Sequence, residues 1–89
     1  MSEEKFTQLP WRIEEFRDFI SIMAGYSEIC YIDGDLNCDN VQANARLIAA
    51  APEMYELLAL LDNYYAVRGE SNRVTKTISQ VLKKVRGEE

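Results

Sequence analysis

The sequence predicts an α+β fold in which a short antiparallel β-hairpin packs on two or three α-helices. Two observations lead to this prediction. β-Branched and aromatic residues cluster in residues 19–32, whereas apolar residues recur at helical spacing from Pro52 onward. A length of 89 residues corresponds to one domain. We expect residues 1–89 to form that domain, with flexible ends at residues 1–9 and 87–89.

The hairpin is predicted from two apolar runs, Phe19–Met23 and Ser27–Ile32, which a short link around Gly25 joins. Glycine suits such a tight turn because it adopts a positive φ without steric cost. Trp11–Ile13 is a candidate third strand at the edge. The alternative for the first run is a helix that begins at Pro10, and it would make the protein an all-α bundle. We favour the hairpin, because the second run is hard to make helical and a lone strand needs a partner.

The rest of the chain is predicted to be helical. After a turn at residues 33–37, Asp39 or Asn40 is a candidate cap for a helix that is rich in alanine. Pro52 either kinks this helix or lies in the first turn of the next one, where its missing N–H is not needed. Gly69 suits the left-handed position that ends this helix.

The last two helices are expected to pair antiparallel as a helical hairpin, because each carries one apolar stripe. Ser71 or Asn72 is the candidate cap of the last helix. We expect the central stripe residues Leu58 and Val81 to lie in the core. The stripes consist of Met54, Leu57, Leu58, Leu61 and Tyr65 in one helix and of Val74, Ile78, Val81, Leu82 and Val85 in the other.

The composition argues against several classes of function. The sequence contains no histidine, which removes the usual general base and the Ser-His-Asp and Cys-His nucleophiles. We therefore expect no enzymatic activity and no cofactor. No apolar run approaches the roughly 20 residues of a membrane span, and the acidic N-terminus is unlike a signal peptide. The sequence predicts a cytoplasmic protein with no membrane partner, in which Cys30 and Cys38 are reduced.

The net charge of −5 is unevenly distributed along the chain. Residues 1–62 hold four basic and twelve acidic side chains, which gives −8, and residues 63–89 hold six and three, which gives +3. The basic cluster has no interleaved aromatic residues, so a solvated helix face is favoured over a nucleic-acid surface. This cluster consists of Arg73, Lys76, Lys83, Lys84 and Arg86.

Two partial metal motifs are present, and neither predicts a site. Asp33, Asp35 and Asn37 have the spacing that opens an EF-hand loop. The glycine and the bidentate glutamate that such a loop needs are replaced by Cys38 and Asn44, so calcium binding is not expected. Two cysteines without a histidine supply only half of a structural zinc site.

The candidate binding surface lies on the helix that follows Pro52. This helix has apolar and aromatic residues around its sides, beyond the main stripe. Tyrosine offers a large contact area at a low entropy cost and is enriched at the energetic centres of interfaces. Burial between the hairpin and the last helix is an equally open interpretation. The candidate partner-binding residues are Tyr55, Leu60, Tyr64, Tyr65 and Val67.

The segment Asn44–Glu53, with the sequence NARLIAAAPE, and the following Met54–Leu58 resemble a stretch that recurs in small bacteriophage and prophage proteins. In many of these proteins, a Pro-Trp pair like Pro10-Trp11 precedes a short hairpin. The resemblance covers about residues 10–61, with a longer insert at residues 37–40. It implies a phage accessory protein, a class that often adjusts or blocks host functions, including defence systems.

Taken with the composition, the resemblance implies a non-enzymatic phage accessory protein that binds and inhibits a host macromolecule, for example a component of a defence system, in the bacterial cytoplasm. The expected partner is a host protein or further copies of the chain, in a homodimer or a higher oligomer. Two alternatives stay open. One is an oligomer that sequesters a small molecule or a nucleotide, and the other is a nucleic-acid-binding regulator that uses the basic last helix.

Overall fold

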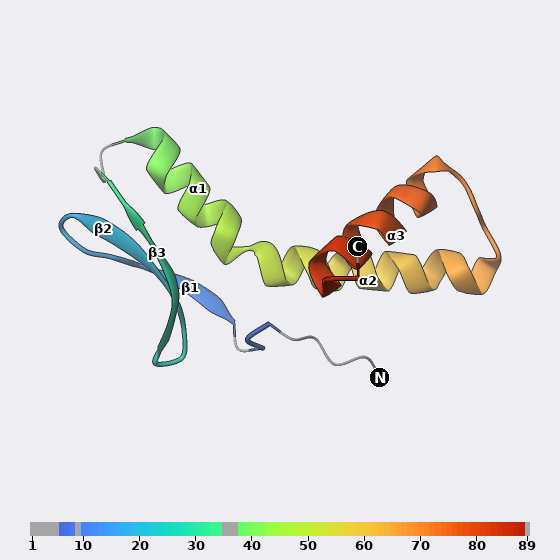
Figure 1. Cartoon of the computed structure of the whole chain (residues 1–89), viewed down its shortest axis with the longest axis horizontal. Helices are drawn as coiled ribbons and strands as arrows, with labels where there is room; N and C mark the ends of the chain where they lie inside the picture. Colours follow the sequence, from blue (N-terminus) through green and yellow to red (C-terminus); the bar gives the residue numbers. More distant parts are fainter. Residues whose placement is uncertain (1–5, 9, 35–37, 89) are drawn as a thin grey trace. The chain divides into compact units, whose positions relative to one another are not determined.

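The computed structural model describes residues 6–8, 10–34 and 38–88 (Figure 1). A three-stranded antiparallel sheet comes first and three helices follow, which confirms the α+β fold. The all-α alternative is therefore wrong. The chain divides into two compact units, Met1–Pro52 and Glu53–Glu89.

The sheet of the first unit has the strand order β1-β2-β3. The strands are β1 (Trp11–Glu15), β2 (Phe19–Ala24) and β3 (Ser27–Asp33). The predicted hairpin and the third strand are both confirmed. Gly25 has a φ of 62°, and Ala24 pairs with Ser27 across the two-residue turn. A side chain at the position of Gly25 would be strained, so glycine determines where the chain reverses.

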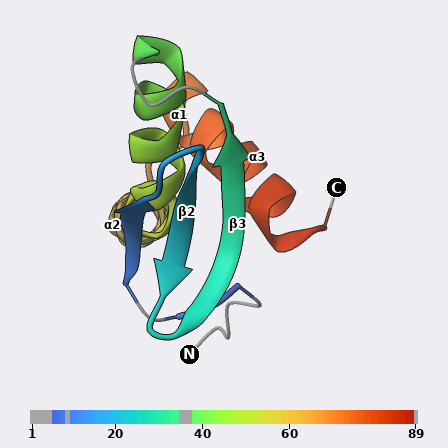
Figure 2. The ribbon, with the colours of Figure 1, turned by 90° about the vertical axis from the view of Figure 1, so that its left-hand side faces the viewer.

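One face of the sheet is covered by α1 (Asp39–Ala49), which lies behind the strands in Figure 2. Strand alternation directs Ile20 and Ile22 toward α1, where they pack with Ala45 in a buried cluster. All three side chains are at most 1% exposed. The residues packed around this cluster are Trp11, Ile13, Ile29, Cys30, Ile32, Val41, Ile48 and Ala49.

The N-terminus of α1 differs from the prediction. Cys38 is the N-cap, with φ −83° and ψ 120°, and its side chain makes no capping hydrogen bond. The predicted caps, Asp39 and Asn40, already belong to the helix, so neither has the extended backbone that an N-cap requires. Asp39 instead lies in the first turn, where its carboxylate stabilises the positive end of the helix dipole.

The second unit contains most of α2 (Ala51–Arg68) and all of α3 (Arg73–Arg86). Pro52 lies in the first turn of α2, as predicted. Gly69 follows the helix with a φ of 70°, which confirms it as the left-handed terminator. Asn72 caps α3: its side chain accepts from the Thr75 amide at 3.0 Å, and the Thr75 hydroxyl accepts from the Asn72 amide at 2.8 Å.

Fewer residues are buried between α2 and α3 than the two predicted apolar stripes contain. Only Tyr55, Ile78 and Leu82 are buried among the described residues of this unit. Two helices touch along one line, so a pair of helices buries a strip on each and leaves the flanks exposed. The expected core position of Val81 is therefore wrong, and Leu58 is half-buried. Exposed stripe residues are Met54 at 40%, Leu57 at 57%, Val74 at 57%, Val81 at 38% and Val85 at 49%.

Local contacts are present within the ends that were expected to be flexible. The Trp11 indole N–H donates to the carbonyl of Thr7 at 3.1 Å, and the Phe6 ring meets the indole edge to face. Gly87, with a φ of 75°, closes α3. Residues 1–5, 9 and 89 lie outside the described residues, and a single domain over the whole chain stays a prediction.

Candidate interaction surface

The side of α2 that faces away from Tyr55 is strongly apolar and exposed. Leu60 is 68% exposed and Val67 is 80% exposed. A helix that is apolar around its circumference is normally buried on all sides, but α3 covers only one side of α2. The exposed side forms a shallow pocket of about 550 Å³. We name this pocket the α2 surface, and its residues are Leu57, Leu60, Leu61, Asn63, Tyr64, Val67 and Arg68.

Tyr64 is positioned by neighbours on two sides. Its ring meets the Tyr65 ring edge to face, with 5.4 Å between the ring centroids. Arg68 lies one helical turn after Tyr64. Its guanidinium carbon is 5.4 Å from the centroid of the Tyr64 ring, within the range of a cation–π interaction. The Arg68 side chain also lies 3.6 Å from a Glu70 carboxylate oxygen. A partner would therefore meet an aromatic ring whose orientation is already restricted, which lowers the entropy cost of binding.

Three of the five candidate residues, Leu60, Tyr64 and Val67, lie together on the α2 surface. Tyr65 is half-buried and supports the ring of Tyr64 from the side. The role of these residues in binding stays a prediction. Leu57 and Leu61 belong to the predicted core stripe, but the structure places them at this surface. Leu57, Leu60, Leu61, Tyr64 and Arg68 are related by intervals of three and four residues, which predicts that they share one side of the helix.

Tyr55 is separated from this group, because it lies on the side of α2 that meets α3. Its side chain is only 5% exposed. The Arg86 guanidinium donates a hydrogen bond of 2.9 Å to the Tyr55 hydroxyl and lies 5.7 Å from the ring centroid. The same hydrogen bond is the main cause of a raised pKa for Arg86. Tyr55 therefore stabilises the helical hairpin and does not belong to the α2 surface.

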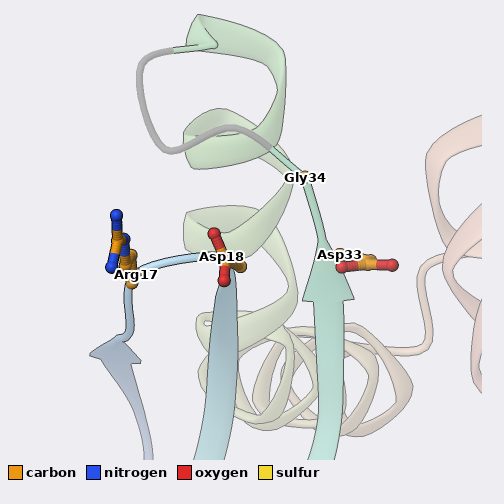
Figure 3. A pocket seen from close by; sticks show the side chains of 4 residues that line it. All are labelled: Arg17, Asp18, Asp33 and Gly34. Atoms are coloured by element: carbon orange, nitrogen blue, oxygen red, sulfur yellow. The ribbon is translucent and has the colours of Figure 1, made fainter.

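A second pocket, of about 390 Å³, lies at one end of the sheet in the first unit (Figure 3). Arg17 and Asp18 form the turn between β1 and β2, and the Gly34 amide donates to the Asp18 carbonyl at 3.4 Å. Asp33, at the end of β3, completes the lining. The side chains of Arg17 and Asp33 lie on opposite sides of Asp18 and point in different directions. The charged groups therefore do not converge on one ligand position.

The partial metal motifs are not assembled in the part of the chain that the structure describes. Asp35 and Asn37, which would continue the EF-hand spacing after Asp33, lie outside the described residues. Among residues 6–8, 10–34 and 38–88, no group of three or more His, Cys, Asp or Glu side chains is arranged to hold a metal ion. Cys30 and Cys38 are free thiols, and Cys30 packs against the core as a small apolar side chain.

The family model described as Salmonella phage P22 protein Y8K6 matches residues 1–89. No curated protein and no solved structure matches the chain. Within the described residues, none of the helices combines the length and the apolar character that crossing a membrane requires.

Proposed function

The chain belongs to the family of Salmonella phage P22 protein Y8K6, and from this premise we propose that it is an accessory protein that binds and inhibits a macromolecule of the bacterial host. The α2 surface carries the proposal. Large apolar side chains are exposed next to one another on this surface, and contiguous apolar patches on small proteins typically mark interaction sites.

The apolar side chains of the α2 surface supply enough burial for specific binding. Covering one fully exposed large apolar side chain contributes about 1.5–3 kcal/mol. Leu57, Leu60, Tyr64 and Val67 are each more than half exposed. A partner that covers all four therefore gains several times the contribution of one side chain. This gain offsets the loss of translational and rotational freedom on association.

The acidic residues near the start of α2 favour a basic partner. Glu53 and Glu56 are exposed, whereas Asp62 is half-buried. Helical spacing places Glu53 and Glu56 beside the apolar strip rather than under α3. Exposed carboxylates at the rim of an interface mainly increase the association rate with a partner of opposite charge. We therefore expect the host macromolecule to present an apolar groove with basic residues around it.

We propose binding without catalysis, in the host cytoplasm. The sequence has no histidine, and the charged side chains of the pocket in Figure 3 do not converge. Inhibition would follow from steric cover of a functional surface on the host macromolecule. A homodimer or a higher oligomer is compatible with this function as long as the α2 surface stays accessible.

The test is an affinity purification from host lysate with a tagged chain, followed by mass spectrometry. A Tyr64→Ser variant should lose the captured partner. Tyr26→Ser is the matched control, because the exposed fraction of Tyr26 is 104% and it lies in the other unit, at the β2–β3 turn. With the purified partner, Tyr64→Ser should raise the dissociation constant by about 30-fold, which corresponds to an interface hot spot. Equal capture by both variants and the unmodified chain would place the binding surface elsewhere.

A further inference from the structure

The face of the sheet opposite to α1 carries an acidic and aromatic surface of its own. Directly paired residues of neighbouring strands point to the same face, and Ile20, Ile22 and Ala24 occupy the α1 side of β2. We name the other side the open sheet face (Figure 2). It comprises Arg12 and Glu14 of β1, Phe19, Ser21 and Met23 of β2, and Glu28, Tyr31 and Asp33 of β3.

Aromatic rings are concentrated at one end of this face. Phe16 stacks on Phe19 with 4.7 Å between centroids, and Tyr31 meets Phe19 edge to face at 5.9 Å. Phe16 is 45% exposed and Tyr31 is 61% exposed. A sheet that carries apolar groups on both faces normally packs a second layer against the face that its own helix leaves uncovered. The exposed rings therefore make this face suited to packing against a helix or another apolar element.

The charges around the rings are mostly negative. Glu14, Glu28 and Asp33 are the acidic residues of this face, and Glu28 accepts a hydrogen bond from the hydroxyl of Ser21. Arg12 is the basic residue of the face, and its guanidinium lies 3.6 Å from the Glu14 carboxylate. Residues 1–52 hold four basic and nine acidic side chains, which gives −5. An element that covers the open sheet face should therefore be basic.

The exposed flank of α3 has the complementary character. This helix holds five basic side chains and no acidic one. Val74, Val81 and Val85 form a stripe on it that α2 does not cover. With 3.6 residues per turn, Arg73 and Lys84 lie along one side of this stripe, three turns apart. The helix thus offers an apolar strip with a basic border, which matches the aromatic surface with its acidic border.

We propose that a second copy of the chain docks its α3 on the open sheet face, which gives a symmetric dimer with two such contacts. The dimensions agree. At about 1.5 Å per residue, the 14 residues of α3 span about 21 Å, and at about 3.3 Å per residue, the seven residues of β3 span about 23 Å. Outer strands of a three-stranded sheet lie about 10 Å apart, close to the diameter of a helix. The contact uses a surface other than the α2 surface and does not depend on the proposed host partner.

The test exchanges the charges of the two surfaces. The first variant combines Arg73→Glu with Lys84→Glu, and the second combines Glu14→Lys with Asp33→Lys. Glu28 is kept because it accepts from Ser21. The matched control combines Lys76→Glu with Lys83→Glu, which makes the same charge change on the side of α3 away from the valine stripe. Sedimentation velocity measures the dimer dissociation constant, and circular dichroism verifies that each variant is folded.

The unmodified chain should sediment as a dimer, and the first two variants should each raise the dissociation constant at least about tenfold, because like charges then face each other. The control should change it by less than about threefold, as expected for exposed charges outside the contact. An equimolar mixture of the first two variants should form a heterodimer of nearly the original affinity, because opposite charges again face each other in both contacts. A monomeric unmodified chain, a mixture without heterodimer, or a dimer that Tyr64→Ser abolishes would overturn the proposal.

Discussion

The two compact units of the molecule use their apolar residues differently. In the first unit, α1 and β2 enclose Ile20, Ile22 and Ala45, each at most 1% exposed. The second unit buries Tyr55, Ile78 and Leu82 but carries eight of the twelve exposed large apolar side chains among the described residues. A sheet with a helix encloses a core from several sides, whereas two helices bury only a strip. The apolar residues of the first unit mainly stabilise its fold, whereas many of those in the second remain exposed.

The largest effect should come from the centre of the first unit. Ile22→Ala removes a side chain with 0% exposure, and the cavity should lower the free energy of unfolding by about 3–5 kcal/mol. Chemical denaturation followed by circular dichroism measures the change. The control is Leu47→Ala on the exposed side of α1, where Leu47 is 61% exposed and the change should stay near 0.5 kcal/mol. Equal effects of both substitutions would contradict the enclosed core.

A smaller effect is expected in the helical hairpin. Leu82→Ala removes a side chain that is 1% exposed and should destabilise the protein by about 2–3 kcal/mol, because the strip between two helices collapses more easily than an enclosed core. Val81→Ala, at the adjacent position, should destabilise by less than about 1 kcal/mol, because Val81 is 38% exposed. The same denaturation experiment compares the two variants. At a protein concentration below the dimer dissociation constant, a larger loss for Val81→Ala than for Leu82→Ala would contradict the narrow contact between α2 and α3.

The capping box of α3 should contribute less than the buried leucine. Asn72→Ala removes the acceptor of the Thr75 amide and should lower the free energy of unfolding by about 1 kcal/mol. Asn72→Asp keeps the acceptor and should change the stability by only a few tenths of a kcal/mol. Thermal unfolding of both variants tests the prediction. An equal loss for both would show that the side-chain acceptor does not stabilise α3.

The smallest effect on stability is expected where the effect on binding is largest. Tyr64 is 54% exposed, so Tyr64→Ser should change the free energy of unfolding by less than about 0.5 kcal/mol. Thermal unfolding and the affinity purification are measured on the same preparation. A variant that unfolds would place Tyr64 in the core and contradict the difference between the two units.

Features that depend on a few neighbouring residues could be predicted from the sequence. The turn at Gly25 and the end of α2 at Gly69 could be predicted, and the cap of α3 could be narrowed to Ser71 or Asn72, because each feature depends on the local preference of one residue. The predicted start of α1 is too late, because the structure has Cys38 as the N-cap and Asp39 in the first turn. Aspartate is favoured at both positions, so the sequence does not distinguish a cap from a first-turn residue.

Which side of α2 packs against α3 could not be predicted from the sequence. Apolar residues occur on all sides of this helix, so periodicity does not select one face. Tyr55 was consequently assigned to the surface and Leu57 to the core, whereas the structure has the opposite arrangement. Leu60, Tyr64 and Val67 were identified as surface candidates because they lay outside the predicted stripe. The hydrogen bond from Arg86 to Tyr55 is the contact that shows which side of α2 packs against α3. It joins residues 31 positions apart, so the sequence around either residue does not predict it.

The hydrogen bond between Arg86 and Tyr55 also determines how the end of α3 moves. Terminal turns of helices open and close rapidly in water, because their last carbonyls lack partners inside the helix. Here Arg86, in the last turn of α3, is held by Tyr55 near the start of α2, while Gly87 closes the backbone. Opening of that turn must therefore also break the contact with α2. The amide protons of the final turn should consequently exchange with solvent more slowly than those of a free helix end. Their exchange should require α2 and α3 to separate, so a change that weakens the contact between the two helices should speed this exchange.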